Sequence, residues 1–236
     1  MTVFTLKIIA LASMIIDHLA VVFPDIFPFW FRGIGRLAWP IFAFLLADGF
    51  RHTKSPEKFV MRLLAFALIS EIPYDIAMGN SISFISDTNI FYTLFLGGMA
   101  ICLYERMKDR YNWQMAAVIG AIFPTAVFAE LLTADYSGIG VLFIFAVYAI
   151  KHQRLRIAAV GAFTLSQFIP LVPAHFLGID IRLEYWLMIP FALASVPLIA
   201  MYNGKRGVQA KWWFYLAYPA HLVVLVIIAA TVSGFT

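Results

Sequence analysis

Asp17 and His18 are neighbouring ionisable residues inside an apolar run that extends from Ile8 to Phe23. Ionisable side chains at membrane depth are costly, so they usually face a cavity or a partner and mark a site of function. Histidine exchanges protons near neutral pH and can therefore serve as a general base. We interpret His18 as a candidate catalytic residue in a membrane-embedded chamber, whereas Asp17 could equally belong to a structural ion pair.

The composition indicates a polytopic membrane protein. Of the 236 residues, 63% are hydrophobic and 13% are charged, and the mean hydropathy is +0.88. A soluble domain averages about 45–50% apolar and about 25% charged residues. The single cysteine, Cys102, allows neither a disulfide within the chain nor a metal-ligand spacing. The first apolar run leads into Phe23 and Pro24 without a small-residue cleavage site, which predicts a retained first span.

Apolar runs long enough to cross a membrane recur along the whole chain. A span needs about 20 residues, and the pattern predicts an all-α helix bundle of about nine spans, with an error of about one. The candidate ranges are 3–23, 33–50, 59–78, 89–105, 113–132, 138–150, 155–171, 183–201 and 212–233. The 138–150 range is short, so it either crosses with little tilt or is re-entrant. No inverted repeat is visible, which argues against a transporter built from two halves. We treat 1–236 as one domain.

Lysine and arginine concentrate in alternate loops. The basic loops are 51–58, 106–110, 151–156 and 203–211. The loops that alternate with them are 24–31, 79–88, 133–137 and 172–182. Of the 17 Lys and Arg residues, only Arg32, Arg36 and Arg182 fall on the second side. The positive-inside rule then predicts a cytoplasmic N-terminus and, with nine spans, an outer C-terminus.

Helical rise places several polar side chains at similar depth. Measured from the cytoplasmic ends of their spans, His18, Glu71 and His221 lie about 14–16 Å into the membrane. The side chains expected slightly further out, at roughly 20–22 Å, are Arg36, Asp75 and Thr93. Because the inner halves of most spans are apolar, the polar groups are predicted to form a funnel that opens to the outside.

The direction of each side chain limits its partners. Asp17 and His18 are neighbours in sequence and point about 100° apart on a helix, so Asp17 is not expected to orient the His18 ring. Glu71 and Asp75 are four residues apart and share a helix face. Either of them could hold the ring instead. Arg36 has a suitable depth to neutralise Asp17 or one of these two carboxylates.

Structural roles remain open for two of these residues. Glu71 precedes Ile72 and Pro73, so it could serve a helix kink rather than chemistry. His221 follows Pro219, so its whole function could be a hydrogen bond to a carbonyl that the proline leaves free. The basic loops are explained first by topology, so a ligand-binding role needs separate support.

Several strings along the chain resemble the TraX family of integral membrane proteins, named for the pilin acetylation protein of conjugative plasmids. The strings include Met14-Ile15-Ile16-Asp17-His18, Arg32-Gly33-Ile34-Gly35-Arg36, Asp48-Gly49-Phe50-Arg51-His52-Thr53, Ser70-Glu71-Ile72-Pro73-Tyr74-Asp75, Asn89-Ile90-Phe91-Tyr92-Thr93, Asp135-Tyr136-Ser137-Gly138 and Tyr218-Pro219-Ala220-His221-Leu222. They follow the expected order over most of the chain, and the stretch 150–200 contributes little. Asp48 stands where the family more often has Glu, and Ser137 where Gly is common.

The resemblance implies a transmembrane acyltransferase of a bacterial cytoplasmic membrane. The donor would be cytoplasmic acetyl-CoA, and the acceptor would be an amine or hydroxyl of a pilin peptide or glycan on the outer side. A histidine in an early span, here His18, would be catalytic. The sequence contains no nucleotide-binding fingerprint or zinc motif, and we expect neither a metal nor a nucleic acid as a partner.

The predicted roles divide among three groups. His18 would be the general base, with Asp17, Glu71 and Asp75 as the neighbouring carboxylates. The candidates for acceptor binding or for stabilising the tetrahedral oxyanion are Arg36, Asn89, Thr93, Tyr218 and His221. The candidates for binding the phosphates of CoA are Arg51, His52, Lys205 and Arg206. Direct transfer and an acetyl-histidine intermediate both remain open.

Two other classes of function fit the same residues. A proton-coupled transporter or flippase would use the histidine and the carboxylates as a proton relay. A structural partner in a secretion or pilus complex would hold them as a static ion-pair network. Binding of acetyl-CoA separates the enzyme from the transporter, which should bind none.

Overall fold

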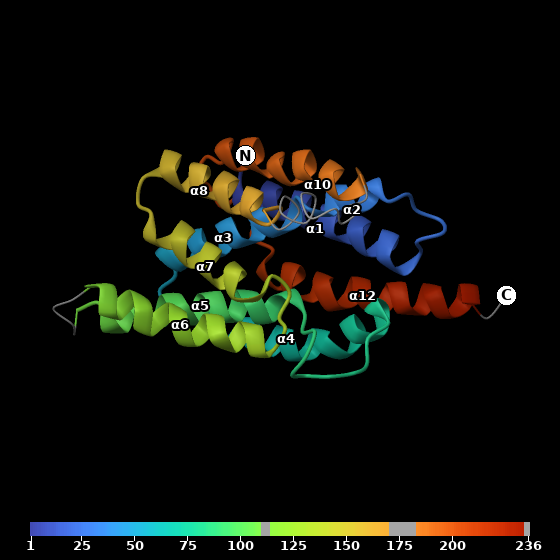
Figure 1. Cartoon of the computed structure of the whole chain (residues 1–236), viewed down its shortest axis with the longest axis horizontal. Coiled ribbons are helices and arrows are strands. Elements are labelled where there is room, and N and C mark those ends of the chain that lie inside the picture. Colours follow the sequence, from blue (N-terminus) through green and yellow to red (C-terminus); the bar gives the residue numbers. More distant parts are fainter. Residues whose placement is uncertain (110–113, 170–182, 234–236) are drawn as a thin grey trace. The chain divides into compact units, whose positions relative to one another are not determined.

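The computed structural model describes residues 1–109, 114–169 and 183–233, and within these ranges the chain is all-α. The helices group into two compact units (Figure 1). The first unit comprises Met1–Phe42 and His152–Thr236, and the second comprises Ala43–Lys151. The long helix α3, Ala38–His52, begins in the first unit and continues into the second.

The first unit combines the two ends of the chain. Besides the start of α3, its helices are α1 (Val3–Val22), α2 (Trp30–Gly35), α8 (Gln153–Ser166), α10 (Leu183–Leu193), α11 (Ser195–Ala200) and α12 (Lys211–Ser233). Helix α1 packs against α2 and α12, and α10 packs against α2, α8 and α11. Figure 1 shows α8 and α10 side by side within this unit.

The start of α1 is capped by a distant loop as well as by its own first residues. Thr2 is the N-cap, and its hydroxyl accepts a hydrogen bond from the Thr5 backbone at 3.2 Å. The N–H groups of Val3 and Phe4 donate to the carbonyls of Lys205 and Arg206 at 2.9 and 3.1 Å. Because these bonds satisfy donors that a helix start leaves unpaired, they hold the basic loop at the first turn of α1.

Helices α1 and α2 approach each other closely at a glycine. A Cβ atom on Gly35 would overlap the side chain of Asp17. Two residues earlier, a Cβ atom on Gly33 would lie 2.6 Å from the Phe191 ring of α10. The short helix α2 is therefore held between α1 and α10, and the absence of side chains at these two positions permits the packing.

The second unit is a bundle around α5. With the remainder of α3, its helices are α4 (Pro56–Met78), α5 (Ile90–Met107), α6 (Gln114–Leu131) and α7 (Ser137–Ala149). Helix α5 packs against α4, α6 and α7, and Figure 1 shows α5 and α6 side by side. Gly97 and Gly98 let α5 approach Ile144 of α7 and Phe50 of α3.

A helix occupies each of the predicted spans. Within the described residues, four helical segments are long and apolar enough to cross a membrane: Val3–Val22, Trp30–His52, Ile90–Met107 and Trp212–Val232. Shorter apolar segments are Met115–Leu131, Ser137–Ala149 and Tyr185–Ala200. The predicted loop 172–182, with Arg182, and the end of the predicted span 155–171 lie outside the described residues.

Two predicted spans contain parts of two helices. The range 33–50 includes the end of α2 and most of α3. The range 183–201 holds α10 and α11, which meet at Ala194. Pro197 has no backbone N–H and cannot donate to the carbonyl one turn earlier, so the helical hydrogen-bond ladder is interrupted at this point. A hydropathy pattern contains no sign of such a break, because both helices are apolar.

Candidate active site

Two histidines from opposite ends of the chain meet in the first unit. Nδ1 of His18 on α1 lies 2.7 Å from Nε2 of His221 on α12. The ring planes differ by only 9°, with centroids 5.0 Å apart. His18 is buried, at 8% exposure, and His221 is half-buried. The two rings, which were predicted to lie at similar depth, are thus in direct contact, and their depth in a membrane stays a prediction.

The second nitrogen of His221 is also engaged. Its Nδ1 lies 3.0 Å from the carbonyl oxygen of Ala217, one helical turn earlier on α12. A hydrogen bond to a backbone carbonyl was the structural role that the sequence left open for His221. The opposite edge of the ring, however, faces His18. Tyr218 is buried and packs edge-on against both rings, with centroids 6.3 Å from His18 and 5.4 Å from His221. The His18 and His221 rings therefore both pack against the Tyr218 ring.

Asp17 has different partners from its neighbour His18. Its carboxylate accepts from the guanidinium group of Arg36 at 3.1 and 3.2 Å, and Arg32 Nε lies 2.7 Å from Oδ1. The predicted Asp17–Arg36 ion pair is confirmed, as is the expectation that Asp17 does not orient the His18 ring. We did not predict the role of Arg32, although its i,i+4 spacing from Arg36 places both cations on one side of the helix.

A second polar cluster lies in the second unit, at the junction of α4 and α5. Asn89 is the N-cap of α5, with its side-chain oxygen accepting from Phe91 N at 2.9 Å. Its amide nitrogen donates to the Ala67 carbonyl at 2.8 Å and to the Glu71 carboxylate. Both amide hydrogens are thus used, so a role for Asn89 as an oxyanion donor would require one of these bonds to break. The Thr93 hydroxyl likewise donates to the Asp135 carbonyl.

The carboxylates of this cluster are only partly satisfied. Glu71 accepts from Asn89 through Oε2, and Asp75 accepts from Ser83 N through Oδ2 at 2.9 Å. Their other oxygens, Glu71 Oε1 and Asp75 Oδ1, are buried and have no hydrogen-bond partner among the described residues. Buried polar atoms normally have partners, so these two atoms can accept a proton or a donor group. Orientation of the His18 ring by Glu71 or Asp75 stays a prediction.

The predicted phosphate-binding residues have mixed surroundings. Arg51 donates to the carbonyls of Val147, Tyr148 and Ile150, which end α7. A cation at this helix end is electrostatically favourable, so Arg51 has a structural function as a C-terminal cap. The adjacent His52 lies 2.9 Å from the carbonyl of Asp48. A phosphate contact by either residue stays a prediction.

The other two predicted phosphate ligands are exposed. Lys205 and Arg206 extend from the loop whose carbonyls cap α1. Lys7 lies near the same end of α1, with its ammonium group 5.1 Å from the centre of the Phe214 ring. Lys7 was not among the predicted phosphate ligands, although its position one turn into α1 puts it at the same end of the helix. Among the described residues, no three His, Cys, Asp or Glu side chains converge as ligands for a metal ion.

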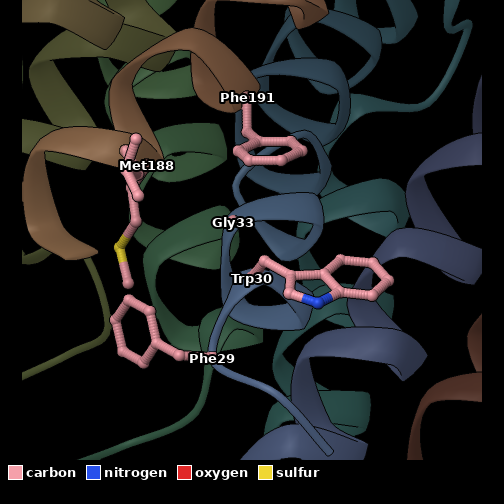
Figure 2. A pocket seen from close by; sticks show the side chains of 6 residues that line it. Phe29, Trp30, Gly33, Met188 and Phe191 are labelled. Carbon is pink, nitrogen blue, oxygen red and sulfur yellow. The ribbon is translucent and has the colours of Figure 1, made fainter.

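An apolar cavity of about 270 Å³ lies between α2 and α10. Figure 2 shows Phe29, Trp30, Met188 and Phe191 around it. None of its lining side chains titrates near neutral pH.

Comparison with known proteins assigns the chain to a family. The model of the TraX protein family matches residues 3–229. This chain belongs to the TraX protein family. A protein of Dichelobacter nodosus described as "Probable fimbrial assembly protein FimC, serogroup H1" is 26% identical and covers 94% of this chain and 93% of its own length. No solved structure matches the chain.

TraX membership confirms the resemblance seen in the sequence strings. The match begins in the first turn of α1 and ends within α12, so it includes His18, His221 and the Glu71 cluster. Both compact units are therefore parts of one family region. With its apolar helices, the chain is a TraX-family membrane protein.

Proposed function

We propose that this TraX-family protein is a membrane-embedded acetyltransferase that uses cytoplasmic acetyl-CoA and an acceptor amine or hydroxyl on the outer side. The observation that carries the proposal is the His18 ring, which is buried in an apolar helix and held by a second histidine at 2.7 Å. A buried histidine in such a helix is expected to have a function. The resemblance described above implies a catalytic histidine in an early span, and we assign His18 the role of general base.

The proposed reaction is a direct acyl transfer. His18 takes the proton of the acceptor N–H or O–H while the acceptor attacks the thioester carbonyl. The new N–C or O–C bond forms a tetrahedral oxyanion, which then collapses with cleavage of the C–S bond. The proton passes from His18 to the departing CoA sulfur, so that the products are the acetylated acceptor and the CoA thiol.

The two substrates would enter from opposite sides. The positive-inside rule favours a cytoplasmic N-terminus, which puts the basic loop at Lys205 and Arg206 on the side where acetyl-CoA is available. Cations of this kind favour phosphate groups. On the acceptor side, the relative named as a fimbrial assembly protein favours a pilin peptide, and a glycan is the alternative acceptor.

The direct test measures transfer of the acetyl group from radiolabelled acetyl-CoA to a pilin peptide by the purified protein in lipid nanodiscs. General base catalysis contributes about 10²–10⁴-fold, so His18→Ala should lower the rate of transfer by that factor while acetyl-CoA still binds. His152→Ala is the matched control, because His152 is exposed at the start of α8. Near-normal turnover by a well-folded His18→Ala protein would overturn the mechanism.

A proton-coupled transporter is the second candidate. It is favoured by Glu71 Oε1 and Asp75 Oδ1, which are buried and have no hydrogen-bond partner in the described part of the chain, because such carboxylate oxygens suit a proton relay. The two functions differ in their ligands. If the wild-type protein binds no acyl-CoA but moves protons across proteoliposomes together with a solute, the transporter replaces the enzyme.

A further inference from the structure

The two histidines form a hydrogen-bonded chain that ends on a backbone carbonyl. The chain runs from the Ala217 oxygen to Nδ1 of His221 at 3.0 Å, and from Nε2 of His221 to Nδ1 of His18 at 2.7 Å. A carbonyl oxygen can only accept a hydrogen bond, so Nδ1 of His221 must carry a hydrogen. This single constraint fixes the positions of the other protons.

A neutral imidazole has one N–H, so a hydrogen on Nδ1 of His221 leaves a lone pair on its Nε2. That lone pair must accept from His18, which therefore carries its hydrogen on Nδ1. The remaining nitrogen, Nε2 of His18, then has a free lone pair. These proton positions follow from the number of hydrogens and lone pairs on each ring, and they do not depend on a bound substrate.

The competing arrangement requires a charged ring. If His221 carried hydrogens on both nitrogens, it would donate to His18 and reverse the direction of that bond. A cation would then be held in an apolar span at considerable cost. The carboxylate nearest in sequence, Asp17, already pairs with Arg32 and Arg36. The neutral chain is therefore favoured.

We propose that His221 is a positioning residue that fixes the tautomer of His18, with the proton on Nδ1 and the lone pair on Nε2. The tautomer is a property of the protein alone, and its catalytic meaning rests on the proposed acetyl transfer. In that reaction, Nε2 is the atom that removes the acceptor's proton, and it later returns the proton to the CoA sulfur. While His18 is charged, its Nδ1–H continues to donate to His221.

The arrangement performs with a neutral residue what a carboxylate performs in a Ser-His-Asp triad, where the third group holds the tautomer and orientation of the histidine. Spacing on α12 makes this possible. Ala217 and His221 are four residues apart, and Tyr218 and His221 are three apart, so all three share a helix face. Tyr218 packs at 68° to the His18 ring and 66° to the His221 ring. This aromatic contact restricts rotation of both rings.

The test of the tautomer is ¹⁵N NMR of the wild-type protein in nanodiscs, labelled in its five histidines. Signals are assigned by their loss in His18→Ala and His221→Ala proteins. We expect protonated Nδ1 and unprotonated Nε2 in both His18 and His221, whereas histidine free in water favours hydrogen on Nε2. A His18 ring with its hydrogen on Nε2, or a mixture of both forms, would overturn the proposal even if acetyl transfer were found.

Two substitutions then test the positioning role. His221→Gln keeps an oxygen that can accept from His18, and His221→Leu removes the acceptor. Groups that hold the second nitrogen of a metal-binding histidine change activity by about 10–100-fold when they are removed. We expect a loss of kcat of the same order in the leucine variant, with a mixed His18 tautomer and an acetyl-CoA KM within about twofold. The glutamine variant should recover most of the rate and the single tautomer.

The outcomes separate this inference from the proposed function. A leucine variant with the wild-type His18 tautomer and rate would refute the role of His221. A glutamine variant as impaired as the leucine variant, with both folded, would also refute it. If the wild-type protein transfers no acetyl group, the proposed function fails, and the NMR measurement still decides whether His221 sets the tautomer.

Discussion

Replacement of Asp17 by Asn should destabilise the protein without removing its chemistry. Asp17 receives contacts of 2.7, 3.1 and 3.2 Å from Arg32 and Arg36, and its side chain is 14% exposed. Asparagine has nearly the same shape but no charge, so the two guanidinium groups would lose their counter-charge. The perturbation therefore tests the ion pair alone.

The magnitude follows from burial. Removal of one partner from a fully buried ion pair costs about 3–5 kcal/mol. The side chains of Arg32 and Arg36 are 33% and 25% exposed, so water screens the charge that is left behind. We therefore expect the free energy of unfolding to fall by about 2 kcal/mol, near the lower part of the range for hydrogen bonds to charged groups. For a chain of this size, that corresponds to a decrease in Tm of about 4–8 °C.

The assay is thermal unfolding in detergent, followed by circular dichroism, with acetyl transfer measured on the same samples. A double-mutant cycle with Arg36→Gln should show a coupling free energy of about 1 kcal/mol, since the two residues contact directly. The kcat per folded molecule should stay within about threefold of wild type. An unchanged Tm combined with a large loss of kcat would refute the structural interpretation and make Asp17 part of the catalytic machinery.

Three further predictions concern topology, the donor and packing. In a protein that lacks Cys102, a cysteine introduced by Lys54→Cys should be shielded from an impermeant thiol reagent added outside. A cysteine introduced at the exposed Ser81 should be labelled, and the reverse pattern would show that the predicted orientation is wrong. Arg206→Ala should raise the KM for acetyl-CoA several-fold, but Arg51→Ala should mainly lower Tm, because Arg51 caps α7; equal effects on KM would make both phosphate ligands. Gly33→Leu should lower Tm, because its Cβ would lie 2.6 Å from the Phe191 ring, and a Tm equal to wild type would show that α10 can move away from α2.

The helices could be predicted because their limits coincide with changes in hydropathy. The range 3–23 became Val3–Val22, and 89–105 became Ile90–Met107 with Asn89 as its cap. The break at Ala194 was missed because the residues on both sides are apolar, so hydropathy does not change where α10 ends and α11 begins. Hydropathy reports burial, and it is insensitive to the continuity of the backbone ladder.

For the candidate site, the sequence could indicate which residues to examine but not which side chains would be in contact. Counting residues placed His18 and His221 at one level, and their rings do meet. Their pairing could not be read from the sequence, because it depends on which helix packs against α1 and on the rotation of each helix about its axis. Arg51 shows a related limit. The positive-inside rule accounts for its charge, but the carbonyls of α7 that it caps lie almost a hundred residues away.

Helix α1 is joined at two levels to the C-terminal part of the chain, once to the loop before α12 and once to α12 itself. The first level is the cap that Lys205 and Arg206 provide for the start of α1, and the second is the contact between His18 and His221. Helical rise puts about 22 Å between Val3 and His18. Insertion of one residue in α1 would lengthen this path by only about 1.5 Å, but would turn His18 by about 100° away from His221. The two contacts therefore constrain the rotation of α1 far more strictly than its length, and rotation is what directs Nε2 of His18.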